Sequence, residues 1–195
     1  MRKKEGNKEV AILDSAIKVF AEYGYHKSKI YKIAELANVA TGSVYVYYDD
    51  KEAILRKIFD QLWDRLYLQL KSVHENEHLT SIEKIDALID ILFDIFLENS
   101  ALALVFVNEQ FQLIQKAPEK FTDSYNKFLD LGEHIVQEGI DTKLFNPKID
   151  VKIIRSFIFG GLRHLLHQWA HEPALYPLHT IRQNVKFITK NGLLK

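Results

Sequence analysis

Residues 28–52 read Ser28-Lys-Ile-Tyr-Lys-Ile-Ala-Glu-Leu-Ala-Asn-Val-Ala-Thr-Gly-Ser-Val-Tyr-Val-Tyr-Tyr-Asp-Asp-Lys-Glu52. Apolar residues at helical spacing predict a short helix that begins after a capping Ser28 and ends in a left-handed turn near Asn38. A second short helix is expected over about 41–48. Two short helices joined by a tight turn are the layout of a helix-turn-helix, whose second helix lies in the major groove of DNA. The stretch therefore predicts a DNA-binding element.

The predicted DNA-contacting surface consists of the side chains that the packing of the two helices leaves outward. Hydroxyl groups can bond phosphates or base edges, and Gly42 lets the helix N-terminus approach the DNA backbone. Lysines on either side add positive charge. The residues expected to contact DNA are Ser28, Lys29, Thr41, Gly42, Ser43, Tyr45, Tyr47 and Lys51.

Helical periodicity continues on both sides of this stretch and predicts an all-α protein of about nine helices. Gly24 is expected to end the first helix, Asp49 and Glu52 to form a capping box for the fourth, and Ser81 and Asp150 to cap two later helices. The other expected helices cover about 8–23, 50–71, 81–96, 101–115, 118–138 with Pro118 first and Gly139 just beyond, 151–170 and 178–190.

Composition narrows the possible functions. The chain has 195 residues, is 47% hydrophobic and contains no cysteine, so disulfide frameworks, thiolate metal sites and cysteine nucleophiles are excluded. Its formal net charge is zero, which requires any nucleic-acid surface to be local. The longest apolar run, residues 101–107, is far shorter than the roughly 20 residues of a membrane span. No signal peptide is recognisable. We expect a cytoplasmic protein that does not enter a membrane.

The sequence from about Ile12 to Leu55 resembles the TetR family of bacterial transcriptional repressors. The resemblance rests on Phe20-Ala-Glu-Tyr-Gly-Tyr, Ile33-Ala34, Val39, Gly42, Val44-Tyr45, Tyr47-Tyr48 and Lys51-Glu52. It implies a helix-turn-helix domain, assigned to residues 1–52, and a helical ligand-binding and dimerisation domain, assigned to residues 53–195. It also implies a homodimer that binds a double-stranded DNA operator and that a small molecule regulates.

Two departures from the family pattern affect what can be carried over. The family commonly has Gly at the position of Asn38, and Asn still permits the turn. It often has Lys at the position of Thr41, so the operator preference of a relative cannot be copied. Weaker similarity in residues 24–28 and in Phe159-Gly-Gly near Trp169 suggests the fatty-acid-metabolism regulators of the family, which sense acyl-coenzyme A (acyl-CoA) thioesters.

Aromatic residues on inward-facing stripes of the C-terminal helices are consistent either with plain core or with a pocket for an apolar ligand. The expected effector is largely apolar with an anionic or polar end, such as a long-chain acyl-CoA. Arg163 would bind its head, although a salt bridge to Glu109 or Glu133 is an alternative role for this residue. The predicted ligand-binding residues are Trp63, Phe93, Phe106, Phe159 and Arg163.

The eighth predicted helix is apolar nearly all round, which indicates cover on more than one side. Together with the ninth helix it fits a four-helix dimer interface formed by two subunits. The predicted interface residues are Ile154, Gly161, Leu165, Ile181, Val185 and Ile188.

Other functions receive less support from the sequence. His164, His167 and His171 lie on one helix face, where hydrogen-bonded structure is more common than a metal site, so no metal or other cofactor is expected. The chain has no glycine-rich phosphate loop and no nucleophile elbow, and an enzyme is not expected. The alternative hypothesis is a helical carrier or enzyme that uses the central pocket and does not bind DNA.

Overall fold

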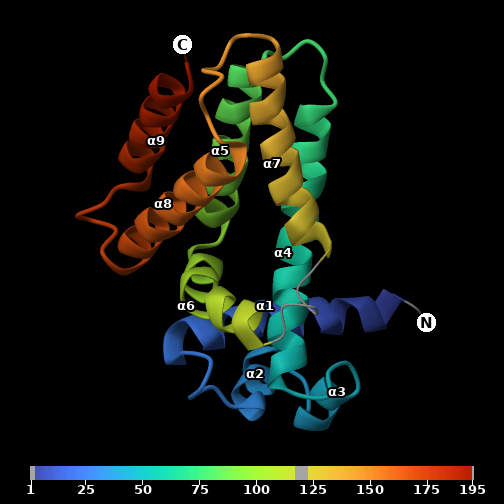
Figure 1. Ribbon diagram of the computed structural model, residues 1–195. Coiled ribbons are helices and arrows are strands. Elements are labelled where there is room, and N and C mark those ends of the chain that lie inside the picture. The colour runs from blue at the N-terminus through green and yellow to red at the C-terminus, as the bar shows by residue number, and fades with distance from the viewer. Residues whose placement is uncertain (1–2, 117–122, 195) are drawn as a thin grey trace. The chain divides into compact units, whose positions relative to one another are not determined.

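The computed structural model describes residues 3–116 and 123–194. Within these ranges the chain forms nine α-helices (Figure 1), which confirms the all-α class. None of the described helices is both long and apolar enough to span a membrane. The helices are α1 (Lys3–Tyr23), α2 (Ile30–Leu36), α3 (Thr41–Tyr45), α4 (Lys51–His74), α5 (Ser81–Glu98), α6 (Ser100–Lys116), α7 (Asp123–Asp141), α8 (Val151–His171) and α9 (Leu178–Leu193).

Three of the predicted helix boundaries are confirmed by backbone geometry. Gly24 follows α1 with φ of 73°, and Asn38 follows α2 with φ of 53°. Both angles lie in the left-handed region that glycine and asparagine tolerate. The Asp150 carboxylate accepts hydrogen bonds from the backbone N–H groups of Lys152 and Ile153, as expected for the cap of α8.

Other predicted caps are displaced by one residue. The N-cap of α2 is Lys29, because the Ser28 hydroxyl is buried and engaged elsewhere. Asp50 caps α4 in place of Asp49, accepting a 2.7 Å bond from the Ala53 N–H. Thr80 caps α5 in place of Ser81 and forms a capping box with Glu83.

Two further expectations concern α7. Pro118, predicted to open this helix, lies outside the described residues. Gly139, predicted to follow the helix, lies within it, because α7 continues to Asp141. Gly139 is in close contact with the segment after α7. The ring of Phe145, fully buried, occupies the space where a side chain at position 139 would begin.

The chain divides into two compact units. The first contains the described parts of 1–62 and 101–121, so α6 belongs with the N-terminal helices. In this unit α2 packs against α1 and α3. Its buried core draws on every helix of the unit and includes Ile12, Phe20, Ile33, Val44, Ile54, Phe59 and Phe106.

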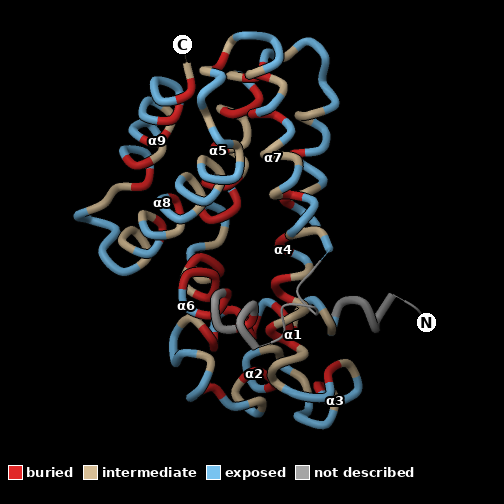
Figure 2. Tube along the Cα trace, in the orientation of Figure 1, coloured by how far each residue is buried: buried red, intermediate tan, exposed pale blue. Residues whose placement is uncertain are grey.

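In the second unit, the described parts of 63–100 and 122–195, four helices form a closed ring. Helix α5 packs against α7 and α9, and α8 packs against the same two helices from the other side. The part of α4 that belongs to this unit contacts α7 through Trp63, whose ring meets those of Tyr125 and Phe128. Figure 2 shows that α8 is mostly exposed or half-buried, and its buried residues are Leu162 and Leu166.

Candidate functional site

The second helix of the helix-turn-helix presents an accessible face. Val44 is buried and fixes α3 to the unit, whereas Thr41, Gly42 and Tyr45 are exposed. A side-chain carbon added at Gly42 would meet no atom within 4 Å, so a ligand can approach this backbone closely. Ser43 and Tyr47 are half-buried and Lys29 is exposed. These six predicted DNA-contacting residues are therefore accessible.

Ser28 and Lys51 hold the loop between α1 and α2. The Ser28 hydroxyl, 2% exposed, donates to the backbone oxygens of Val19 and Gly24 at 3.1 and 2.7 Å. The Lys51 Nζ donates to the backbone oxygens of Tyr25, His26 and Ser28 at 2.5, 3.2 and 3.2 Å. Both side chains are thus engaged in holding the loop, and their contact with DNA stays a prediction.

The same loop is held from α6 as well. The Tyr25 N–H donates to the Glu109 carboxylate at 3.4 Å, and Glu109 is buried. The Lys51 ammonium also lies 4.3 Å from the centre of the Tyr25 ring. Burial, and then the charge of Lys29, lowers the pKa of Lys51. The loop before α2 is thus a packed junction of α1, α4 and α6.

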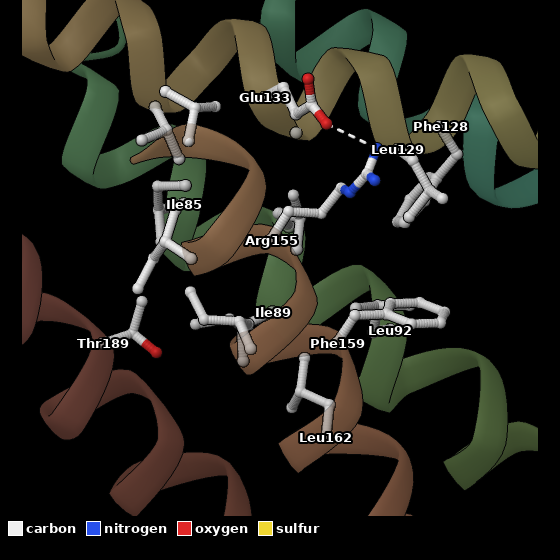
Figure 3. Close-up of a pocket in the computed structure, with 16 residues that line it drawn as sticks. Ile85, Ile89, Leu92, Phe128, Leu129, Glu133, Arg155, Phe159, Leu162 and Thr189 are labelled. Carbon is white, nitrogen blue, oxygen red and sulfur yellow. Dashed lines mark ion pairs between the residues drawn. The ribbon is translucent and has the colours of Figure 1, made fainter. Parts of the chain in front are cut away.

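A cavity of about 60 Å³ lies inside the ring of four helices in the second unit (Figure 3). Its walls are almost entirely apolar. Three polar residues also line it, namely Glu133, Arg155 and Thr189. The remaining lining residues are Ile85, Leu88, Ile89, Leu92, Phe128, Leu129, Gly132, Val136, Val151, Ile154, Ile158, Phe159 and Leu162.

One ion pair joins two walls of the cavity. Arg155 of α8 and Glu133 of α7 approach to 2.5 Å, and both side chains are partly exposed. Figure 3 shows the pair on the α7 side of the cavity. The sequence pattern indicates Glu133 as a possible partner of Arg163 and does not single out Arg155, with which the structure pairs it. The signal was an arginine within an otherwise apolar part of the same helix.

Among the five predicted ligand-binding residues, Phe159 alone lines the cavity. Trp63 packs against Phe159, and the centres of their rings are 6.1 Å apart. Phe93 is buried beneath the Arg182 guanidinium, and Phe106 packs against Phe59 in the first unit.

Arg163 lies near Tyr125. Burial raises the pKa of Tyr125, and the charges of Arg155 and Arg163 act in the opposite direction. Both guanidinium groups are therefore close enough to this phenol to influence it. Arg155 is the arginine that lines the cavity.

The six residues predicted to form the dimer interface differ in how far the structure exposes them. Ile181 and Val185 are buried inside their own chain, and Ile154 lines the cavity. Leu165 is half-buried, whereas Gly161 and Ile188 are exposed. The large apolar side chains that the structure exposes on these two helices are Ile153, Phe157, Phe187 and Ile188. These four side chains are the large apolar ones on α8 and α9 that a partner could cover.

The three histidines of α8 are exposed. The rings of His167 and His171 lie 4.5 Å apart, and His164 contacts Gln168. Burial, and then the charges of His171, His164 and Arg163, lowers the pKa of His167. Within 3–116 and 123–194, no three histidine or acidic side chains are grouped so that they could hold a metal ion.

Comparison with known families accounts for most of the chain. The profile described as "Bacterial regulatory proteins, tetR family" matches residues 12–58, and the profile "YsiA-like protein, C-terminal region" matches residues 59–191. The chain belongs to the tetR family. It is a DNA-binding transcriptional regulator, and this membership favours that function over the alternative of a helical carrier or enzyme.

Relatives in the tetR family are similar along the whole chain. The fatty acid metabolism regulator protein of Bacillus subtilis is 28% identical over 98% of both chains. The structure of the fatty acid degradation regulator FadR from Bacillus halodurans is 29% identical, with a TM-score of 0.85 over 95% of each chain. That of FadR from Bacillus subtilis in complex with stearoyl-CoA is 28% identical, with a TM-score of 0.83 over 94% of this chain and 98% of the other.

Proposed function

We propose that this regulator is a homodimeric repressor that a long-chain acyl-CoA releases from its operator in the cytoplasm. The observation that carries the proposal is the apolar cavity inside the ring of α5, α7, α8 and α9. The similar FadR of Bacillus subtilis was solved with stearoyl-CoA, which supports an acyl chain as the occupant. Arg155 offers hydrogen-bond donors to a polar group next to the chain.

The size of the cavity suggests how ligand and DNA binding are coupled. A volume of about 60 Å³ is well below the roughly 300–1,000 Å³ of small-molecule sites. An acyl chain must therefore part the helices around it and separate Arg155 from Glu133. A ligand that binds the opened arrangement better shifts the population toward it. Release of DNA follows if the opened arrangement binds the operator less well.

The proposed contacts to DNA come from α3 and the residue before α2. Thr41, Ser43, Tyr45 and Tyr47 supply hydroxyl groups, Gly42 supplies an open backbone, and Lys29 supplies charge. We assign the helix-turn-helix to residues 1–52 and ligand binding and dimerisation to residues 53–195. The exposed apolar face of α8 and α9 is the proposed dimer surface.

The test begins with selection of genomic DNA fragments that the protein retains, which yields the operator. The protein–operator complex is then titrated with acyl-CoA of increasing chain length, with free coenzyme A and with unrelated cationic drugs. We expect long acyl thioesters alone to release the DNA. Release by cationic drugs but not by acyl thioesters would contradict lipid sensing and leave DNA binding intact.

A variant ties this response to the cavity. Gly132 lies in the cavity wall, and a side chain added there points toward Leu88 at 3.5 Å. Gly132→Val should therefore reduce the space for an acyl chain. We expect operator affinity to be retained and the acyl-CoA response to be lost. An unchanged response in the folded variant would place the acyl chain elsewhere.

A further inference from the structure

Helix α3, the recognition helix of the helix-turn-helix, carries none of the side chains that most often read bases in the major groove. Arginine and lysine bind guanine through paired hydrogen bonds, and asparagine and glutamine bind adenine in the same way. Residues 41–48 read Thr41-Gly-Ser-Val-Tyr-Val-Tyr-Tyr48 and contain none of these four types and no acidic residue. Hydroxyl groups and apolar carbons are therefore all that the side chains of this stretch can present to base edges.

Val46, directly after α3, is the most exposed of the large apolar residues in the described part of the chain. Its exposed fraction is 80%. The backbone angles of Val46, φ of −70° and ψ of −29°, continue the turn of the helix. Val46 therefore lies on the same face as Gly42, four residues earlier, where the open space lets DNA approach.

The residues on both sides of Val46 are anchored to the unit. Val44 and Tyr48 are buried, and the backbone N–H groups of Tyr47 and Tyr48 both donate to the Val44 oxygen at 3.0 Å. The Tyr48 hydroxyl donates to the Glu9 carboxylate of α1 at 3.1 Å. A valine side chain is itself restricted, because it branches at the β-carbon. The two methyl groups of Val46 are therefore presented to the outside from a fixed support.

An aliphatic side chain in the major groove has thymine as its matching partner. The polar groups of the base edges there are hydrogen-bond donors and acceptors, whereas thymine adds a methyl group at C5. The recognition helix of a helix-turn-helix lies in this groove. Contact between an aliphatic side chain and the thymine methyl removes both apolar surfaces from water, which stabilises the complex.

We propose that Val46 is a specificity-determining residue whose methyl groups contact the C5 methyl of one thymine in each half of the operator. The inference rests on the proposed function and deepens it, because it names a base that the operator must contain. It also gives a recognition helix without charged or amide side chains a means of distinguishing sequences. Uracil at that position removes the methyl group and leaves every hydrogen-bonding group in place.

The test uses the full-length protein and the operator obtained from genomic fragments, in which each thymine is replaced in turn by deoxyuridine. Affinities are measured by fluorescence anisotropy at one salt concentration. For the wild-type protein we expect uracil at one position to weaken binding about fourfold in one half-site and about fifteenfold in both, in keeping with the burial of one methyl group in each. In Val46→Ala the thymine-to-uracil ratio at this position should fall to about one.

Two further variants show whether the effect belongs to this side chain. Val46→Ile, which keeps a branched apolar side chain, should retain the preference for thymine. The matched control is Val10→Ala, a change at an exposed valine of α1, and it should show the same ratio as the wild-type protein. Val46→Ala should bind the thymine operator about as tightly as the wild-type protein binds the operator with uracil in both half-sites.

Two results would overturn the thymine contact and leave operator binding standing. One is a wild-type protein that binds every uracil-substituted operator as tightly as the thymine form. The other is a Val46→Ala protein that keeps the full effect of uracil at every position. Failure of the wild-type protein to retain any genomic fragment more tightly than random DNA would contradict operator binding itself, and the thymine contact with it.

Discussion

Lys29, which precedes α2, and Lys51, which begins α4, have different roles. Lys51 donates to three backbone oxygens of the 25–28 loop, whereas Lys29 is exposed. Hydrogen bonds to charged groups contribute about 1.5–3 kcal/mol. We expect Lys51→Ala to lower the free energy of unfolding by about that amount and Lys29→Ala to leave it nearly unchanged.

Urea denaturation of both variants checks this expectation, and operator titrations separate the two roles. Lys29→Ala should weaken binding to all DNA sequences and reduce its salt dependence, because a phosphate contact is lost. A stable Lys51→Ala protein would show that the three hydrogen bonds do not hold the loop.

Histidine 167 provides a prediction of pH dependence. Burial, and then His171, His164 and Arg163, lowers its pKa below the ordinary value of 6.5. As the pH falls from 6.5 toward this lowered pKa, the unfolded chain binds a proton that the folded chain does not, so stability falls. Nuclear magnetic resonance titration should find His167 titrating below 6.5, and His171→Asn should raise its pKa. A His167 that titrates at or above 6.5 would contradict this.

At the scale of the element, α7 and the turn after it depend on a glycine. Phe145 is fully buried against Gly139, and the backbone N–H groups of Leu144 and Phe145 both donate to the Gly139 oxygen, at 2.9 and 2.8 Å. A methyl group at position 139 would overlap the phenyl ring. We expect Gly139→Ala to lower the free energy of unfolding by about 1–3 kcal/mol, the cost of overpacking.

The matched control for this variant is Gly192→Ala in α9, where the added carbon meets no atom within 4 Å. Alanine favours a helix over glycine by about 1 kcal/mol, so this variant should be at least as stable as the wild-type protein. Thermal unfolding of the two variants decides the point. Equal melting temperatures would mean that Phe145 moves aside without cost.

Helix existence could be predicted from sequence more reliably than helix boundaries. The spacing of apolar residues is set by the period of the helix, so it identifies the elements. Adjacent residues with similar side chains compete for a cap, as Asp49 and Asp50 do, and Thr80 and Ser81. In the structure, Asp50 caps α4 and Thr80 caps α5. The close packing of Gly139 against the Phe145 ring involves two residues that only the packed structure brings together.

For the whole molecule, the exposed face of α8 and α9 predicts the oligomeric state. Phe157 is 71% exposed and lies one helical turn from the exposed Ile153, and neighbouring exposed apolar side chains of this kind mark interaction sites. We expect Phe157→Asp to produce monomers in sedimentation experiments and to weaken operator binding, because two linked recognition helices bind more tightly than one. Leu68→Asp, a control at an exposed residue of α4, should remain a dimer. A dimeric Phe157→Asp protein would exclude this face.

The sites were less predictable than the fold because side-chain direction within a helix depends on what surrounds the helix. Residues of α9 such as Ile181 and Val185 follow an apolar pattern that fits either an interface or a core, and the structure places them in the core. The sequence pattern singled out Arg163 and not Arg155, and only the ring of four helices places Arg155 at the cavity. The exposed residues of α3 were easier to predict from the sequence, because the turn before this helix fixes which of its faces points outward.

The membership of α6 in the first unit has a practical consequence for hybrid regulators. A gene fusion at residue 52 would join these DNA-reading helices to a foreign α6, and the buried Glu109 that accepts from the Tyr25 N–H would be replaced by whatever the donor carries. The compact unit that contains the helix-turn-helix is therefore not one continuous stretch of sequence. An engineer who transplants it must also graft the face of α6 that touches it, some fifty residues further along the gene.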